Sequence, residues 1–165
     1  MDVSNQLNIQ PFVSTGLNCY PNPEEKRGTI STVGVAVQGT DTLFLTEMVA
    51  GSYIYNASSN ELRIVKSVNS DTLAYIDVAF GTDLSEVTPS VIDKNFTHVK
   101  GYVIAVATTA DAQMADNNGE LIPSLLKGQV FNFGKTGNDR SDNKANLTPI
   151  IVDATGTTVS ITIIY

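Results

Sequence analysis

Cys19 and His98 are the side chains of this sequence best suited to nucleophilic catalysis. The 165 residues contain one cysteine and one histidine, so any Ser/His/Asp or Cys/His arrangement must use His98. Cys19 lies far away along the chain, in a segment interrupted by prolines. A lone histidine beside Thr97, at the start of an expected strand, is more often structural or exposed than catalytic. We therefore predict that the protein is not an enzyme and has no catalytic residues.

The tripeptide Gly134-Lys135-Thr136 resembles the end of a phosphate-binding loop. Such a loop has four residues between its first glycine and the Gly-Lys pair, and here five residues separate Gly128 from Gly134. No helix is expected after the tripeptide, so no helix N-terminus would face a phosphate. We therefore interpret the match as a coincidence.

Two polar loops carry oxygen ligands of the kind that calcium prefers. Neither has the full spacing of a calcium loop, and side chains of this kind commonly hydrogen-bond their own backbone in turns. We predict no metal and no cofactor, and leave calcium open for Asp139 and Asp142. The candidate ligands are Asp139, Asp142 and Asn143 in one loop, and Asp116, Asn118 and Glu120 in the other.

Composition narrows the classes of partner. The net charge is −7 and the only adjacent basic pair is Lys26-Arg27, so the chain lacks the basic surface that nucleic acid requires. No apolar run is long enough to span a membrane, and no secretory signal is visible. A single cysteine fits the cytosol. Only 16% of residues are charged while 42% are hydrophobic, which favours a homo-oligomeric subunit whose faces are covered by neighbours.

Residues 39–80 hold the clearest structural pattern. Strand-forming runs at 53–55, 62–68 and 73–80 are separated by polar turns at 56–60 and 69–71, which predicts an antiparallel meander. Before it, 43–49 lacks strict alternation and suits one helical turn that plugs a small barrel. Alternation breaks near Val65 and Val68, which indicates bulges or burial on both sides.

The same stretch resembles a small β-domain of tailed-phage structural proteins, found in fibres, tail adaptors, neck proteins and head-decoration proteins. The usual family form is GT-x-F…GD-x-I…V-x-S-V-x-S-D-T-x-L, and in this sequence the pattern is GT-x3-F…G-x-x-I…V-x-S-V-x-S-D-T-L. The sequence departs from it at Ser52 and Ala74. The resemblance implies a barrel plugged by Phe44, with Val65, Val68 and Leu73 in its core. The matching residues are Gly39, Thr40, Phe44, Gly51, Ile54, Val65, Ser67, Val68, Ser70, Asp71, Thr72 and Leu73.

We divide the chain into an N-terminal arm (1–27), a small β-barrel (28–81), a linker or inter-sheet connection (82–95) and an antiparallel β-sandwich (96–165). Strands are expected at 28–32 and 34–38, with Val33, Val35 and Val37 on one face. The arm is too apolar for a purely solvated tail, which leaves three alternatives: a strap over the protein's own barrel, an interface with a neighbouring subunit, or a disordered segment. In the second case its deletion would weaken assembly and leave the domains folded. The interface residues would be Leu7, Ile9, Phe12, Val13, Leu17 and Tyr20.

The second half has the pattern of a five-stranded sandwich. A near-continuous apolar run at 102–107 indicates a central strand, and Phe131 and Phe133 share one face of another. Segments 149–152 and 157–165 are expected to form a closing hairpin across 153–156. Val159, Ile161, Ile163 and Tyr165 would line one face of its last strand. The predicted fold is all-β, a small antiparallel barrel followed by an antiparallel sandwich.

Three functional classes follow from these patterns. The first is a non-enzymatic structural protein of a tailed-phage virion, assembled in the host bacterial cytoplasm and packed against its own copies and other virion proteins. The second is a carbohydrate- or host-surface-binding fibre module, for which Tyr53, Tyr55 and Tyr75 are candidate contacts. The third, a small enzyme, is disfavoured by the missing catalytic groups. Location on the head, neck, tail or fibre is left open.

Overall fold

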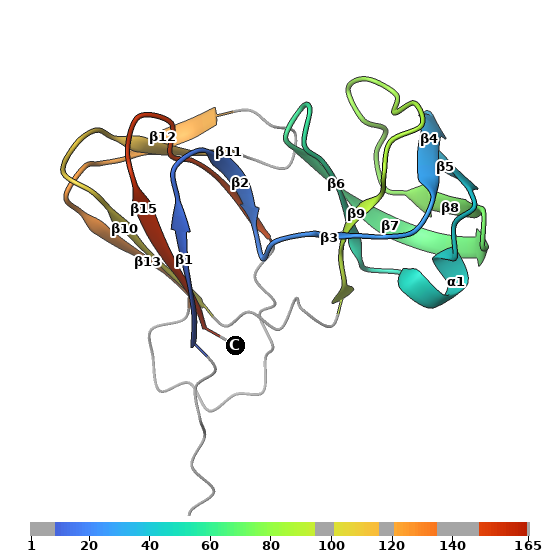
Figure 1. The fold of residues 1–165 in the computed structure, drawn as a ribbon, viewed down its shortest axis with the longest axis horizontal. Coiled ribbons are helices and arrows are strands. Elements are labelled where there is room, and N and C mark those ends of the chain that lie inside the picture. The colour runs from blue at the N-terminus through green and yellow to red at the C-terminus, as the bar shows by residue number, and fades with distance from the viewer. Residues whose placement is uncertain (1–8, 95–100, 116–120, 135–148, 165) are drawn as a thin grey trace, which may run out of the picture.

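A computed structural model of the chain describes residues 9–94, 101–115, 121–134 and 149–164. Within these ranges the chain forms strands β1–β15, arranged in three antiparallel sheets, and one short helix, α1 (Figure 1). The prediction of an all-β, antiparallel protein is confirmed. The sheets form two units that lie side by side, and the unit formed by residues 24–92 is called the inserted unit here.

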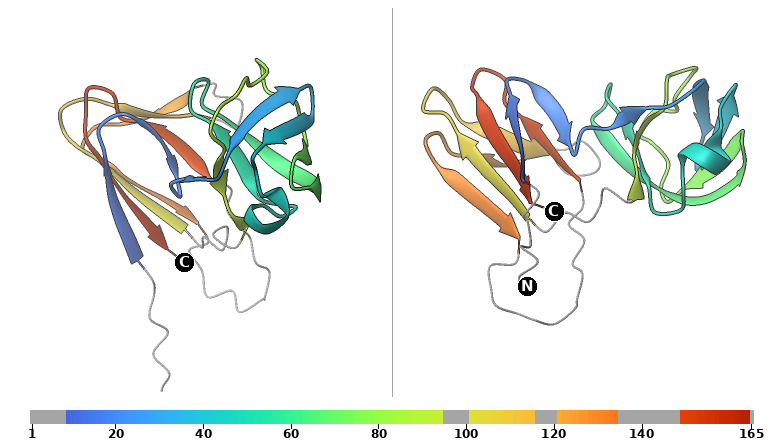
Figure 2. Two further views of the ribbon diagram at one scale, coloured as in Figure 1. Left: turned by 45° about the vertical axis from the view of Figure 1, so that its right-hand side comes forward. Right: turned by 60° about the horizontal axis from the view of Figure 1, so that its bottom comes forward.

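The inserted unit is a seven-stranded sheet in the order β3-β9-β6-β7-β8-β5-β4. The sheet curls strongly, as the right-hand view of Figure 2 shows, but it is not the closed barrel that was predicted. Edge strand β4 contacts the chain that precedes β9 through an isolated bridge between Ile30 and Val87 and through a hydrogen bond from the Thr32 N–H to the Leu84 carbonyl, without a continuous ladder. The sheet does not close into a barrel because the chain before β9 is irregular and does not form a continuous strand that could pair with β4. The strands are β3 (Glu24–Glu25), β4 (Thr29–Val33), β5 (Ala36–Thr40), β6 (Tyr53–Asn56), β7 (Glu61–Ser70), β8 (Leu73–Ile76) and β9 (Ser90–Ile92).

Local predictions for this unit are largely confirmed. The helical turn is α1 (Phe44–Glu47), and β6, β7 and β8 form the expected meander. The register of β7 against β8 shifts at Val65/Ser67 and at Val68/Ser70, so bulges lie where the alternation breaks. The shared face of Val33, Val35 and Val37 is wrong, because Gly34 turns the chain with a φ of 59° and leaves the first two valines exposed.

Residues 82–95, predicted as a linker or connection, contribute to the core of the inserted unit. Strand β9 pairs with β6, and Val91 and Ile92 are buried. Leu84 is buried as well, and the Thr32 N–H donates to its carbonyl over 3.0 Å. The segment resembles a linker in sequence because its few apolar residues are scattered among polar ones.

The second unit is a sandwich of two four-stranded sheets, ordered β1-β15-β10-β13 and β12-β11-β14-β2. Figure 2 shows the two sheets facing each other. Val159, Ile161 and Ile163 of β15 are fully buried between them, as their alternation predicted, while Tyr165 lies outside the described residues. The strands are β1 (Ile9–Ser14), β2 (Leu17–Tyr20), β10 (Gly101–Val106), β11 (Ala112–Ala115), β12 (Leu121–Leu125), β13 (Val130–Gly134), β14 (Ile150–Asp153) and β15 (Val159–Ile164).

Each short connection in this unit crosses from one sheet to the other, in the pairs β1–β2, β10–β11, β12–β13 and β14–β15. Written from its other edge, the second sheet has the order β2-β14-β11-β12. Each of its strands therefore faces the strand of β1-β15-β10-β13 to which it is connected. Eight strands connected in this way form a jelly roll. The predicted hairpin across 153–156 is therefore wrong, because β14 and β15 belong to different sheets. After β14 the chain makes an Asx turn, in which the Thr155 N–H donates to Asp153 Oδ1 over 2.9 Å. Such a turn can connect two strands of different sheets as well as two strands of one hairpin.

Residues 9–20 of the predicted N-terminal arm belong to the jelly roll. Residues 9–14 pair with β15 and residues 17–20 pair with β14, so the segment supplies one edge strand to each sheet of the jelly roll. Its prolines concealed this role, although edge strands tolerate proline. The chain thus begins the jelly roll, leaves it after β2 to build the inserted unit, and returns at β10.

Candidate interaction surfaces

Phe44 plugs the inserted unit as the sequence predicted. Its side chain is 1% exposed and packs in a cluster with Ile30, Val37 and Ile54. Gly39 makes room for the ring, since a Cβ at this position would lie 2.8 Å from Phe44 Cζ. The spacing from the glycine to the aromatic residue therefore has a steric cause.

Asp71 holds the plug from a distant turn. Its carboxylate Oδ1 accepts from the Leu45 N–H over 3.1 Å, and its carbonyl accepts from the Thr42 hydroxyl over 2.5 Å. The helix has no side-chain cap of its own, so Asp71 satisfies a donor at the free N-terminus. From the sequence, Asp71 was expected to be a turn residue and to match the family pattern, without a role in holding the plug. Two residues of the sequence could have indicated this contact: Thr42, just before the plug, and Asp71, in the turn between β7 and β8.

The other predicted core residues differ in their burial. Val65 is 1% exposed and Val68 packs against the same cluster. Leu73 is half-buried and lies outside that cluster, so its assignment was wrong. The bulges in β7 set the register of β8 so that Ala74 and Ile76 point inward instead.

The predicted interface residues occupy several environments. Val13 and Leu17 are exposed, at 69% and 37%, whereas Tyr20 is 3% exposed and belongs to the jelly-roll core. Tyr20 is therefore unavailable to a neighbouring subunit. Ile9 and Phe12 lie on β1, whose backbone alone is described at these positions, and Leu7 lies outside the described residues.

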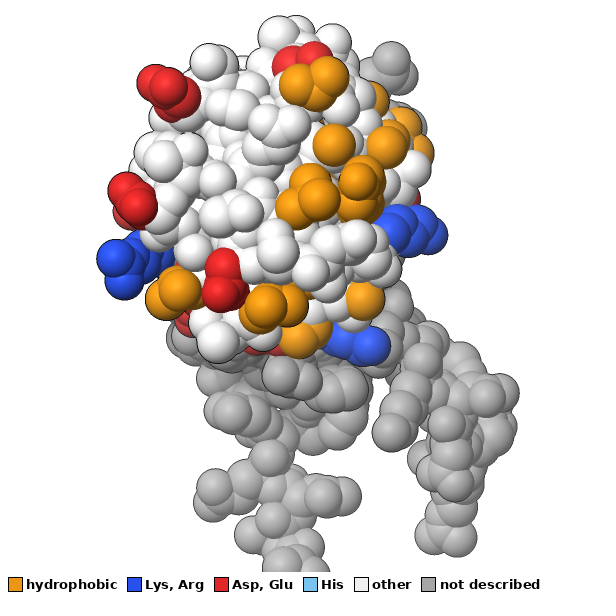
Figure 3. Space-filling view, turned by 90° about the vertical axis from the view of Figure 1, so that its right-hand side faces the viewer, with side chains coloured by type: hydrophobic (Ala, Val, Ile, Leu, Met, Phe, Trp, Pro, Cys, Tyr) orange, Lys and Arg blue, Asp and Glu red, His pale blue; other side chains and the backbone are white. Residues whose placement is uncertain are grey.

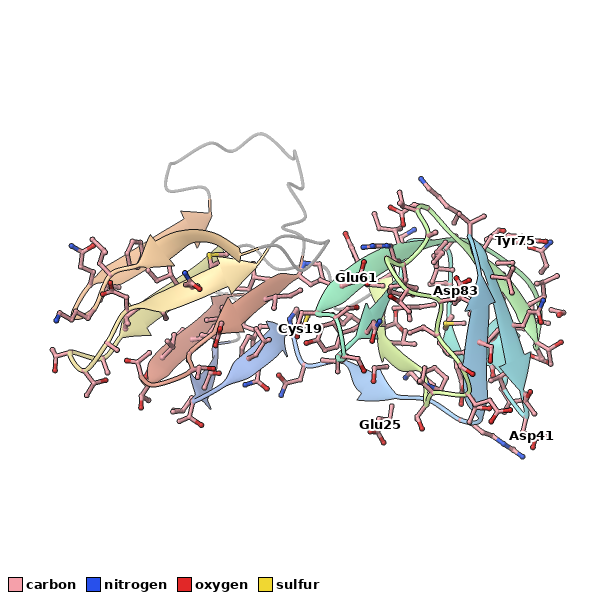
Figure 4. All side chains as sticks on the ribbon, turned by 90° about the horizontal axis from the view of Figure 1, so that it is seen from above. Cys19, Glu25, Asp41, Glu61, Tyr75 and Asp83 are labelled. Atoms are coloured by element: carbon pink, nitrogen blue, oxygen red, sulfur yellow. The ribbon has the colours of Figure 1, made fainter. Side chains whose placement is uncertain are left out.

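A buried cluster joins the two units. Cys19 and Ile151 of the jelly roll pack with Tyr53, Tyr55 and further residues of the inserted unit, and Figure 4 shows Cys19 at the junction. Burial raises the pKa of the Cys19 thiol to about 12. Burial also raises the pKa of Tyr53, and raises that of Tyr55 to about 12. The two tyrosines are thus interior residues, which disagrees with their prediction as contacts for a carbohydrate; Tyr75 is half-buried.

Glu61 and Arg63 form a buried ion pair that the sequence analysis did not anticipate. Their side chains are 6% and 5% exposed. Glu61 Oε1 also accepts from the Gly81 N–H over 2.9 Å, and Arg63 Nε donates to the Ala79 carbonyl over 3.0 Å. The guanidinium carbon lies 5.1 Å from the centre of the Phe80 ring. The pair holds the chain that follows β8 against β7, and no buried side-chain nitrogen or oxygen in the described part of the chain lacks a hydrogen-bond partner.

The remaining candidates for chemistry fall largely outside the described residues. This applies to His98, to Lys135 and Thr136, and to both loops considered for calcium. Among the residues that are described, no three His, Cys, Asp or Glu side chains gather as metal ligands. No helix in the same part of the chain is long and apolar enough to cross a membrane.

Hydrophobic side chains gather at the end of the inserted unit that faces away from the jelly roll (Figure 3). Two groups contribute, one near the β4–β5 turn and one around α1. An exposed apolar area of this kind is typical of a contact surface. The exposed residues are Val33, Val35 and Val78 in the first group, and Leu43, Leu45 and Val49 in the second.

Comparison of the chain with protein-family models, with curated protein sequences and with solved structures gives no match.

Proposed function

We propose that the chain is a non-enzymatic structural component of a tailed-phage particle, a head-associated protein or a neck, tail or fibre adaptor that works through subunit packing. The observation that carries this proposal is the jelly-roll topology, an architecture used by viral capsid proteins. Because the same architecture serves other functions, it supports the proposal only together with surface features of this chain.

Two surface features agree with a role in which the chain packs against other subunits. The inserted unit ends in exposed valines and leucines, and four strands of the jelly roll lie at sheet edges. Sheet edges and apolar patches are the elements that protein subunits bury against each other. In addition, the resemblance that pointed to phage proteins rests on residues with a shared task, since Gly39, Phe44 and Asp71 form and hold the plug.

The alternative is a carbohydrate- or host-surface-binding fibre module. Jelly rolls also occur in lectins, so the topology alone does not separate the two functions. Burial of Tyr53 and Tyr55 at the junction of the units removes two of its three aromatic contacts, which favours the packing role.

Quantitative mass spectrometry of particles of the encoding phage tests the proposal. We expect the chain to remain after a high-salt wash, in a fixed ratio to the major capsid protein that matches a symmetric ring or lattice. Its absence from washed particles would refute the structural role. A density map of the particle would then locate it, and a few copies at fibre ends with bound glycan would support the alternative.

A further inference from the structure

Strand β13 (Val130–Gly134) differs from the other edge strands of the jelly roll. Natural sheets protect their edges with prolines, bulges, charges or covering segments. β1 contains Pro11, and β12 contains Pro123 opposite a register shift. β2 contributes Cys19 to the cluster that joins the units. β13 has the sequence Val-Phe-Asn-Phe-Gly, without proline or charge, and among the described residues it pairs only with β10.

The backbone of β13 presents hydrogen-bonding groups on the side of the strand that faces away from β10. The Val106 N–H donates to the Gln129 carbonyl over 3.0 Å, so residues 106 and 129 form a hydrogen-bonded pair. In an antiparallel ladder such pairs alternate with pairs that are not hydrogen-bonded. The register of β10 against β13 then directs the N–H and C=O groups of 131 and 133 toward β10. Those of Val130, Asn132 and Gly134 point outward.

We propose that β13 pairs antiparallel with β13 of a second copy of this chain, about a two-fold axis at Asn132. In this register 132 faces 132 of the other copy, and 130 faces 134. Every outward-pointing residue then lies in a hydrogen-bonded pair, which yields about six backbone hydrogen bonds between the chains. The two β1-β15-β10-β13 sheets join into one continuous sheet across the axis.

Symmetry favours a second copy as the occupant, and the lack of charge on β13 permits it. Each chain carries a net charge of −7, which opposes self-association over most of the surface. β13 contains no charged residue, so two copies can approach there without like charges facing each other. Val130, which is 60% exposed, would face a glycine and meet no bulky neighbour. Two-fold contacts of this self-complementary kind are the commonest in homo-oligomers.

This inference rests on the proposed packing function and names its partner, a second copy in place of an unspecified neighbour. It concerns the purified full-length chain, so its test does not depend on whether the chain is found in particles.

A charge-swap experiment at residue 132 tests the pairing. The Cα atoms of a hydrogen-bonded antiparallel pair lie about 5.5 Å apart, so Asn132→Asp and Asn132→Lys each place two like charges opposite one another. We expect light scattering after size exclusion to give half the mass of the wild type for each variant, with the dissociation constant raised about tenfold or more. An equimolar mixture of the two variants should regain the wild-type mass, because opposite charges then face each other.

Circular dichroism of each variant shows whether the fold is retained, and recovery in the mixture is itself evidence of intact chains. Val13→Asp on β1, the opposite edge of the same sheet, is the matched control and should keep the wild-type mass. A monomeric wild type would overturn the proposal. So would a pair of residue-132 variants that keep the wild-type mass while Val13→Asp loses it, which would locate the contact at β1.

Discussion

Replacing Phe44 with alanine measures how much the plug stabilises the inserted unit. The side chain is 1% exposed, so nearly all of its area of about 150–250 Å² is buried. At about 25 cal/mol per Å² this burial contributes about 4–6 kcal/mol, part of which alanine retains. The cavity left behind adds to the loss, so we expect the free energy of unfolding to fall by about 3–5 kcal/mol.

The measurement is urea unfolding followed by far-UV circular dichroism, which suits a chain without tryptophan. With a slope of about 2 kcal/mol per molar urea, the midpoint should fall by about 1.5–2.5 M. Leu45→Ala is the matched control, since this residue lies on the same helical turn and is 57% exposed. Its cost should stay within about 0.5 kcal/mol. A cost below about 1 kcal/mol for Phe44→Ala, or one equal to that of Leu45→Ala, would refute the plug.

Five further outcomes are expected. Asp71→Ala should lower the free energy of unfolding by about 1 kcal/mol, the usual worth of a helix cap, and an unchanged urea midpoint would contradict its role. Glu61→Ala should cost about 3–5 kcal/mol, because Arg63 keeps a buried charge without its carboxylate; a double variant that also replaces Arg63 with methionine should recover part of the loss. Cys19 should resist iodoacetamide at pH 8.5 until urea unfolds the chain, and rapid labelling of the native protein would argue against its burial. Since its folded pKa is about 12 against 9.0 for an unperturbed thiol, the unfolded chain loses this proton first. Stability should therefore decline as pH rises from about 9 toward 12, and Cys19→Ser should make that decline less steep. Deletion of residues 1–20 should lower the melting temperature of the jelly roll, because it removes β1 and β2; a truncated chain that melts like the full-length one would show that these strands are dispensable.

Local patterns in the sequence predicted local structure well. Turn residues at 56–60 and 69–71 located the meander, and the broken alternation at Val65 and Val68 located its bulges. The alternation of Val159, Ile161 and Ile163 predicted a buried face. These features depend on neighbours within a few residues, which is the range over which periodicity and turn chemistry act.

Pairing between distant strands could not be predicted in the same way. The turn after Asp153 is compatible with a hairpin or with a crossing between sheets, and only the partners of β14 and β15 decide between them. The same limit hid the pairing of residues 9–20 with the end of the chain. Asp71 and the Glu61–Arg63 pair were missed for a related reason, since their roles depend on segments brought together by folding.

The arrangement of the two units bears on how such a chain could act as an adaptor. An adaptor must contact two partners through separate surfaces held in a fixed relation. The apolar end of the inserted unit and the edge strand β13 of the jelly roll lie on different units of the molecule (Figure 1). The buried cluster around Cys19, Tyr53 and Tyr55 joins the two units. Pairing through β13 would bring two inserted units, each with its own apolar end, into one two-fold assembly, so a pair of chains could contact two further subunits.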